Sequence, residues 1–368
     1  MRTAHVQPVP GDMLAGRRMV LVTENWFGSS GRGLACGFRA NGWAVHEIEN
    51  STFFTRAGTT AGRLVVRLMR PLMIKAYNDA ILTAVEQLRP QALVITKGTY
   101  INPGTLERIA RMRVAAVNYY PDFHFDHSGF NLATLPLYAL VVTTKSFQVR
   151  FLQQLVGAER VVFLHHGYSD LVHFPRFTSV DEAGCLADVT YVGNYALNKE
   201  QWLRSIVRRL PGIRLRVVGS RWEHARDDAL KRCAIGHGLL GDFYARAVQQ
   251  SRINIAVHGE RSKREGWQDL VSTRTFEIPA CKGFMLHIDN HEVRELFEPG
   301  REIDVFASED ELIEKITHYL GRPELRREMI ERAYARCVPA YGYNARAVLI
   351  SRVIASLSCA PAGAETPT

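Results

Sequence analysis

Short apolar runs alternate with longer amphipathic stretches along this chain, and they fall into two series. The first series ends near residue 165, and the second begins at residue 188. Parallel sheets with helices on both faces produce this alternation. We therefore predict two Rossmann-like α/β domains, with strands at 19–23, 44–48, 92–97, 114–119, 137–143, 161–165, from 188, and at 215–218, 253–257 and 284–288.

The stretch 269–288 has the pattern of a loop, a helix start, a tight turn and a buried strand. Ser272 and Thr273 are favourable helix caps, and the free N–H groups of a helix start bind phosphate, with Arg274 adding a full charge. Glu277 lies about one turn further in, within reach of ribose hydroxyls next to the phosphates. These residues suit a nucleoside diphosphate, and they also suit an amphipathic helix packed on a sheet with its Arg and Glu exposed.

Further candidates surround this stretch. Asp269 lies outside the expected helix, where its carboxylate would meet a sugar hydroxyl or a backbone amide. Gly193 and Asn194 end a predicted strand, and Lys199 begins the next helix, where it reaches either a diphosphate or solvent. The basic stretch 258–268 fits a loop that orders over a bound donor, or a solvated loop. Its candidate contacts are His258, Arg261 and Lys263.

Several sequence blocks occur in the order found in one enzyme family. They are the strand I-N-I-A-V, then S-T-R-T-F-E-I-P-A-C-K-G-F, then E-L-F-E-P-G-R-E-I-D-V-F, and a closing Y-G-Y-N-A-R. Residues 253–346 thereby resemble the C-terminal half of the spore-maturation, CgeB-like glycosyltransferases, and the resemblance extends over most of 188–346. Two positions depart from the family pattern: Pro279 falls inside the expected helix, and Lys282 occupies a usually small position.

The resemblance implies a GT-B fold, in which two Rossmann-like domains face a central cleft. It implies transfer of a sugar from a nucleoside diphosphate sugar to a hydroxyl of a glycan, a lipid-linked or a small-molecule acceptor, as in cell-surface or spore polysaccharide synthesis. It favours retention of anomeric configuration, and no cofactor or metal is expected beyond the donor. A GT-B nucleotide-sugar epimerase or hydrolase, or a non-catalytic GT-B binding protein, is the alternative.

The same resemblance, together with composition, defines the expected domains. Residues 1–16 form a loose leader and 17–175 the acceptor-side domain, against which a closing helix at 345–357 packs back. A polar linker at 176–187 leads to the nucleotide-sugar domain at 188–344. Residues 359–368 are expected to be disordered.

The first domain offers two groups of candidates. A Gly-rich loop after the first strand carries Gly28, Gly31 and Gly33, which would let the backbone approach a phosphate, or would only turn the chain. Its spacing is not the dinucleotide fingerprint, so no nicotinamide cofactor is expected. After the strand at 114–119, a polar cluster offers an acid/base pair and, less well, metal ligands. The cluster consists of Asp122, His124, Asp126 and His127.

Residues 63–76 interleave basic and aliphatic side chains, and Pro71 interrupts the run. The pattern favours a helix whose apolar face packs in the core, with a following helix at 78–88. The other interpretation is a basic segment that rests on an anionic membrane surface.

Composition narrows the compartment and the partners. The chain has 368 residues, a net charge of +9 and a pI of about 9.3, which favours acidic partners. No zinc-finger or RNA-binding signature is present, so nucleic acid is an unlikely partner. The six cysteines are scattered, and no apolar run has the length of a signal peptide or a membrane span. A cytoplasmic protein, with peripheral contact to the inner membrane face as an option, is expected.

Overall fold

The computed structural model describes residues 16–54, 58–236, 238–239, 241–258 and 266–359. The chain divides into two compact units. Unit 1 consists of Met1–Leu164 and Tyr343–Thr368, and unit 2 consists of His165–Gly342. The division thus falls at residue 165, within the range expected for the first domain. Nearly all of the expected leader and of the expected tail lies outside the described residues.

Unit 1 is built on a six-stranded parallel sheet with the order β2-β1-β3-β4-β5-β6. All six strands were predicted. Every residue of β3 is buried, as expected for a central strand covered on both faces. The strands are β1 (Arg17–Thr23), β2 (Trp43–Glu49), β3 (Ala92–Thr96), β4 (Ala115–Tyr120), β5 (Leu140–Thr143) and β6 (Val161–Phe163).

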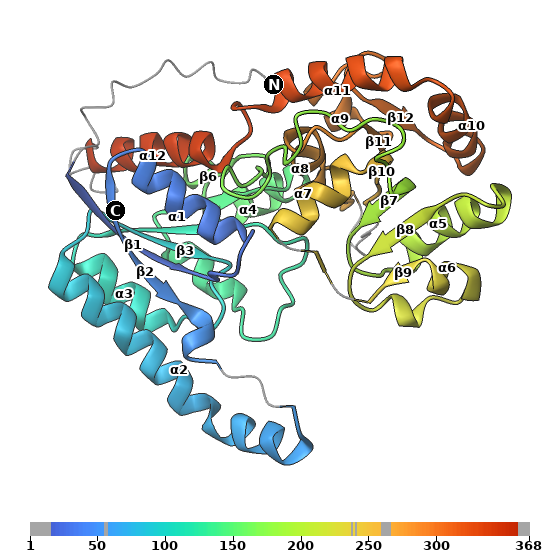
Figure 1. The fold of residues 1–368 in the computed structure, drawn as a ribbon. Helices are drawn as coiled ribbons and strands as arrows, with labels where there is room; N and C mark the ends of the chain where they lie inside the picture. The colour runs from blue at the N-terminus through green and yellow to red at the C-terminus, as the bar shows by residue number, and fades with distance from the viewer. Residues whose placement is uncertain (1–15, 55–57, 237, 240, 259–265, 360–368) are drawn as a thin grey trace. The chain divides into compact units, whose positions relative to one another are not determined.

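Helices α1 and α12 of unit 1 pack side by side, although they lie far apart in the sequence (Figure 1). Ser29 caps α1 by accepting a hydrogen bond from the Arg32 amide. The Trp43 indole donates to the Ser351 hydroxyl of α12 at 2.9 Å. The helices of unit 1 are α1 (Ser30–Ala40), α2 (Thr60–Leu88), α3 (Pro103–Arg111), α4 (Val149–Val156) and α12 (Tyr343–Cys359), with short 3₁₀ turns η2 (Asn50–Thr52), η3 (Leu132–Leu137), η4 (Ser146–Gln148) and η5 (Ala158–Arg160).

The prediction for residues 63–76 was wrong in two respects. Pro71 does not interrupt the helix, because α2 runs continuously for 29 residues. Its first half does not pack in the core either, because the buried residues of α2 begin only at Tyr77. An exposed proline is tolerated here, since the carbonyl group that loses its helical partner can bond to solvent instead.

Unit 2 contains a second six-stranded parallel sheet with the order β12-β11-β10-β7-β8-β9. Four of its strands were predicted, while the short β9 and β12 were not. Strand β12 does not look like a buried strand in the sequence because it begins with an acidic residue, Asp304. The Asp304 carboxylate is buried and accepts a hydrogen bond from the Tyr319 hydroxyl at 2.8 Å. The strands are β7 (Ala187–Val192), β8 (Leu215–Val218), β9 (Ala234–Ile235), β10 (Ser251–Ala256), β11 (Met285–Ile288) and β12 (Asp304–Phe306).

Two apolar clusters pack within unit 2, one around Trp222 and Phe306 and the other around Phe276 and Phe297. No helix in the described ranges has the length and apolar character needed to span a bilayer. The helices of unit 2 are α5 (Leu197–Arg209), η6 (Trp222–His224), α6 (Asp228–Arg232), α7 (Asp242–Gln249), α8 (Arg274–Ala280), α9 (His291–Leu296), α10 (Glu309–Leu320) and α11 (Pro323–Cys337).

Candidate functional site

The sheet of unit 2 has a switch point between β7 and β10. From β7 the chain moves outward to β8 and β9, and then returns to the other side of β7 to form β10, β11 and β12. In parallel sheets, ligands bind beyond the carboxyl ends of the strands at such a point. The segments that follow β7 and β10, which begin at Gly193 and Val257, are therefore the first place to look for a ligand site.

Gly193 and Asn194 form a closely packed turn after β7. Gly219, at φ 149°, approaches so closely that a Cβ atom there would lie 2.2 Å from the Gly193 carbonyl oxygen. The Trp222 indole donates to this oxygen at 2.8 Å, and the Asn194 side chain accepts from the Ser220 amide. The turn is therefore fixed by its neighbours, and it brings the predicted residues Gly193 and Asn194 to the end of β7.

The ammonium group of Lys199, another predicted contact, is turned back toward this turn. It donates to the Asn194 carbonyl oxygen at 3.3 Å. Lys199 and the turn are thus neighbours in the structure.

Helix α8 begins at the predicted place but not with the predicted caps. Thr273, at the N-cap position, has helical backbone angles and makes no side-chain capping bond, so the prediction of caps was wrong. The helix has only seven residues. Pro279 is accommodated near its end, and Lys282 leaves the helix in the left-handed conformation at φ 57°.

The Arg274 side chain places a full positive charge beside the ends of β7 and β10. Its guanidinium lies over the Tyr191 ring, 5.4 Å from the centroid, and donates to the Val257 carbonyl oxygen at 3.2 Å. Burial lowers the pKa of Arg274, but the nearby Tyr191, Tyr244, Glu277 and Asp269 outweigh burial and raise it. Arg274 therefore stays charged.

Three buried polar atoms on or near this guanidinium have no hydrogen-bond partner among the described residues. Buried polar groups normally have partners, so this group of atoms is a candidate place for a polar ligand. They are the Arg274 Nε, the Tyr191 hydroxyl and the Ser272 Oγ.

Glu277 faces a histidine and a tyrosine within unit 2. Its carboxylate is 13% exposed and lies 3.8 Å from Nε2 of His173. The other ring nitrogen of His173 accepts from the Ser169 amide, which places the proton of a neutral ring on Nε2, toward Glu277. Burial lowers the pKa of His173 although Glu277 opposes this effect, and burial together with Glu277 raises the pKa of Tyr244.

A buried pair of histidines, His258 and His287, contacts α8 through the Thr275 hydroxyl. The His287 Nε2 lies 2.9 Å from the His258 Nε2 and 3.0 Å from the Thr275 hydroxyl, and its Nδ1 lies 2.6 Å from the Ile288 carbonyl oxygen. Because only a protonated Nδ1 can donate to that carbonyl, Nε2 is the acceptor in the neutral ring. Burial lowers the pKa of His287 to about 4.

Four predicted donor contacts remain, and the structure describes two of them. His258 is buried in the histidine pair just described. Asp269 is half-buried and close enough to raise the pKa of Arg274. Arg261 and Lys263 lie outside the described residues.

Unit 1 has its own switch point, between β1 and β3, and a charged cluster lies there. The Lys97 ammonium is 3.2 Å from Glu24 and 3.5 Å from Asp122, and His127 Nε2 is 3.3 Å from the same Asp122 carboxylate. Burial lowers the pKa of Lys97, while Asp122 and Glu24 raise it, with a net upward shift. Asp122 and His127 were predicted, whereas Glu24 and Lys97 were missed.

Glu24 and Lys97 carried a usable signal, because Glu24 directly follows the predicted strand 19–23 and Lys97 is the last residue of the predicted strand 92–97. His124, by contrast, makes its contacts with two aromatic residues, Phe123 and Tyr120. Its ring packs edge-on against Phe123 at 4.4 Å between centroids, and its carbonyl oxygen accepts from the Tyr120 hydroxyl.

Two of the three candidate glycines after β1, Gly31 and Gly33, have a packing explanation. A Cβ atom on Gly31 would lie 1.6 Å from the Thr23 hydroxyl, and one on Gly33 would lie 2.3 Å from the Tyr343 ring of α12. Gly28, at φ 99°, has only Trp26 nearby, 3.6 Å from the position of a Cβ atom. The role of the three glycines in phosphate binding stays a prediction.

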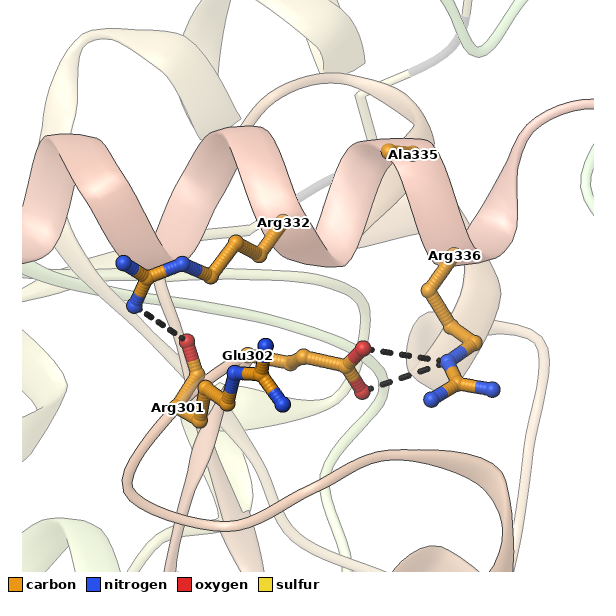
Figure 2. A pocket seen from close by; sticks show the side chains of 5 residues that line it. All are labelled: Arg301, Glu302, Arg332, Ala335 and Arg336. Carbon is orange, nitrogen blue, oxygen red and sulfur yellow. Dashed lines mark hydrogen bonds and ion pairs between the residues drawn. The ribbon is translucent and has the colours of Figure 1, made fainter.

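A pocket elsewhere in unit 2 is lined by Arg301, Glu302, Arg332, Ala335 and Arg336 (Figure 2). Its arginines are already paired: Arg336 with Glu302 at 3.1 Å, Arg301 with Glu298 at 2.9 Å, and Arg332 with Glu328 at 3.2 Å. It is therefore a poor match for a diphosphate. Within the described residues, no group of three or more His, Cys, Asp or Glu is arranged to hold a metal ion.

Comparisons with known proteins agree with this architecture. Residues 198–351 match the sequence model of a family described as glycosyl transferase-like. No curated protein matches the chain in sequence. A sucrose-phosphate synthase from Thermosynechococcus elongatus is similar in structure, with a TM-score of 0.63 and 13% identity, covering 94% of this chain and 100% of its own.

Two further solved structures are similar over nearly the whole chain. A glycosyltransferase from Rickettsia africae has a TM-score of 0.62 and 12% identity, covering 94% of this chain and all of its own. Anabaena HepE in complex with UDP has a TM-score of 0.57 and 10% identity, covering 92% and 100%. The two parallel six-stranded sheets with interleaved helices are those of the GT-B fold, as predicted.

Proposed function

We propose that this protein is a glycosyltransferase that moves a sugar from a nucleoside diphosphate sugar to an acceptor hydroxyl. Unit 2 would hold the donor. The glycosyl transferase-like match over residues 198–351, which contains α8, supports the reaction class. The structurally similar HepE, which binds UDP, supports a nucleoside diphosphate as the donor's leaving group.

One observation carries the assignment of the donor site: around Arg274, at the switch point of the sheet, buried polar atoms have no hydrogen-bond partner among the described residues. In the proposal, the Arg274 guanidinium binds the diphosphate, which gives Nε an acceptor. Glu277 accepts hydrogen bonds from the ribose hydroxyls, and Asp269 lies near the sugar. Gly193, Asn194 and Lys199 line the same end of β7.

In the reaction, the bond from the sugar's anomeric carbon to the diphosphate oxygen breaks, and a bond to the acceptor oxygen forms. Retention is proposed, as the CgeB-like resemblance implies, with the departing diphosphate taking the acceptor's proton. Arg274 would stabilise the charge on that diphosphate, so that no metal is required. Asp122, oriented by Lys97 and His127, would hold the acceptor hydroxyl; if the product is inverted, Asp122 is the base.

The acceptor is proposed to be a glycan, a lipid-linked or a small-molecule hydroxyl, within cell-surface or spore polysaccharide synthesis. The positive net charge of +9 agrees with an anionic donor but does not identify the sugar.

Ligand binding to the folded state tests the proposal. Thermal unfolding is measured with UDP, GDP, TDP and their sugar conjugates, because a ligand specific to the folded state raises the Tm. We expect one nucleotide series to raise it, and Glu277→Gln to weaken that ligand by roughly tenfold to a hundredfold, since a charge-assisted hydrogen bond to ribose contributes about 1.5–3 kcal/mol.

The matched control is Glu314→Gln, which removes the same charge from an exposed position of α10. Equal effects of the two changes would contradict the donor site. Ligand binding with release of free sugar but no transfer would indicate a hydrolase, and no Tm shift with any nucleotide would contradict the proposed function itself.

A further inference from the structure

The first half of α2 carries a concentration of exposed apolar side chains. Most large apolar residues of this chain are buried, but residues 64–72 present five that are 43–71% exposed. Monomeric proteins rarely leave such a contiguous apolar face in water without a function. These residues are Leu64 (59%), Val65 (58%), Leu68 (71%), Met69 (43%) and Leu72 (59%).

These side chains share one face of the helix. Leu64, Leu68 and Leu72 follow each other at intervals of four, and Val65 and Met69 flank them. The helix therefore presents an apolar stripe, which we call the leucine stripe. Among the described residues of unit 1, this part of α2 packs on neither core cluster, and the buried residues of the helix begin only at Tyr77 (Figure 1).

The opposite face of the same segment is basic. Arg63, Arg67 and Arg70, spaced by four and three residues, form a second row. Between residues 60 and 78 there is no Asp or Glu, and the first acid, Asp79, pairs with Lys75. The segment is thus amphipathic, and its uncompensated charge is entirely positive.

The second half of α2 anchors this segment firmly. The Asn78 amide donates to the Ile74 and Tyr100 carbonyl oxygens at 2.8 Å each, and its oxygen accepts from the Asn102 amide. The Tyr77 ring packs between Phe53 and Phe54. The exposed segment therefore projects, as about 25 Å of helix, from a fixed base.

We propose that residues 60–76 are a membrane-binding helix that lies flat in the headgroup region of an anionic lipid surface. The leucine stripe enters the acyl boundary, while the arginines extend to lipid phosphates. A second copy of this chain is a poorer occupant, because it would cover the leucine stripe and leave the row of arginines on the opposite face without a partner of opposite charge. This inference is independent of the donor site.

Vesicle co-sedimentation of the full chain tests it. We expect binding to vesicles of equal parts phosphatidylcholine and phosphatidylglycerol, and little binding to phosphatidylcholine alone. Arg63→Gln/Arg67→Gln/Arg70→Gln should weaken binding about a hundredfold, at about fivefold per arginine. Leu64→Ser/Leu68→Ser/Leu72→Ser should weaken it at least as much, at roughly tenfold per leucine.

Two triple variants in unit 2 are the matched controls. Arg301→Gln/Arg327→Gln/Arg332→Gln removes the same charge, and Leu171→Ser/Leu186→Ser/Leu197→Ser removes three exposed leucines. Both should bind vesicles like the wild type. Hydrogen exchange of the unmodified protein gives a second readout, in which anionic vesicles slow exchange at residues 60–76 and not in β3.

Three results would overturn the inference. The first is equal binding to neutral and anionic vesicles, and the second is equal loss in the test and control variants. The third is self-association in the absence of lipid that the leucine changes abolish, together with no vesicle binding, which would assign the stripe to a second copy of the chain.

Discussion

The two units have the same kind of sheet, but their switch points are chemically different. In unit 1 the charged groups satisfy one another, since Lys97 pairs with both Glu24 and Asp122, and the pairs are open to solvent. In unit 2 the Arg274 Nε and the Tyr191 hydroxyl are buried and have no hydrogen-bond partner within the part of the chain that the structure describes. Polar groups that pair with one another and remain open to solvent are suited to acid/base chemistry on a hydroxyl. Buried polar groups without a partner are suited to binding a ligand.

The comparison predicts that changes at the two switch points separate binding from turnover. Unit 2 variants should act on the donor Kd, and unit 1 variants should act on kcat.

The largest effect is expected for Arg274→Met. Removing two charge-assisted hydrogen bonds to a diphosphate costs about 3 kcal/mol or more, so donor affinity should fall by roughly a hundredfold or more. Calorimetric titration with the nucleotide identified by thermal shift measures it. Arg332→Met, in the pocket of Figure 2, is the control and should leave affinity unchanged. If the donor Kd of Arg274→Met equals that of the wild type, the assignment of donor binding to the switch point of unit 2 is wrong.

Lowering the pH should destabilise unit 2, because His287 binds a proton more readily in the unfolded chain than in the folded one. The unfolded chain binds a proton at this residue near pH 6.5, but the folded ring does so only near pH 4, so the unfolded state binds more protons in between. The free energy of unfolding should therefore fall as pH falls through this window, by about 3 kcal/mol in total.

Urea unfolding at pH 7 and pH 5, followed by hydrogen exchange in β11 and β3 separately, measures the acid effect. His287→Gln should flatten the pH dependence of β11. Equal acid sensitivity of β11 in the variant and the wild type would assign the effect to other groups.

A smaller effect is expected for Asp122→Asn. If Asp122 holds the acceptor hydroxyl, kcat should fall roughly tenfold to a hundredfold while the donor Kd stays constant; a loss of about 10²–10⁴ with an inverted product would make it the base. Steady-state kinetics and the anomer of the product, read by NMR, measure both. Asp126→Asn, at a neighbouring exposed position, is the control. A changed donor Kd with an unchanged kcat would contradict the assignment.

The smallest effect separates packing from phosphate binding in unit 1. Gly31→Ala places a methyl group against Thr23, and overpacking of this kind costs about 1–3 kcal/mol of folding free energy. Donor affinity should not change. Loss of affinity at full stability would instead support the predicted phosphate loop.

Much of the fold was predictable, because buried parallel strands such as β1 and β3 are continuous apolar runs that end in turns. Strand β12 escaped because its buried Asp304 is satisfied by residues of a later helix, Lys315 and Tyr319, which local pattern does not reveal. The first half of α2 escaped because apolar residues usually indicate burial, and sequence does not show that nothing covers them.

The candidate site was predictable only in part. The sequence named Arg274 and Glu277 as candidates because they follow a helix start at fixed spacing. Tyr191, Tyr244 and His173 were not, since they come from three separate elements that only the folded sheet brings around α8. The capping prediction for Thr273 was wrong because backbone conformation at a helix start depends on the preceding loop as well as on residue type.

The docking of α12 against α1 also sets an order of events during synthesis. The seam of α1 at Gly33 and Gly37 is filled by Tyr343 and Ala347, which leave the ribosome only after the whole of unit 2 has been made. Until then, one face of the nascent first unit is left bare. Completion of unit 1 must therefore wait until α12 has been synthesised, while unit 2, continuous in the chain, can fold as soon as it emerges.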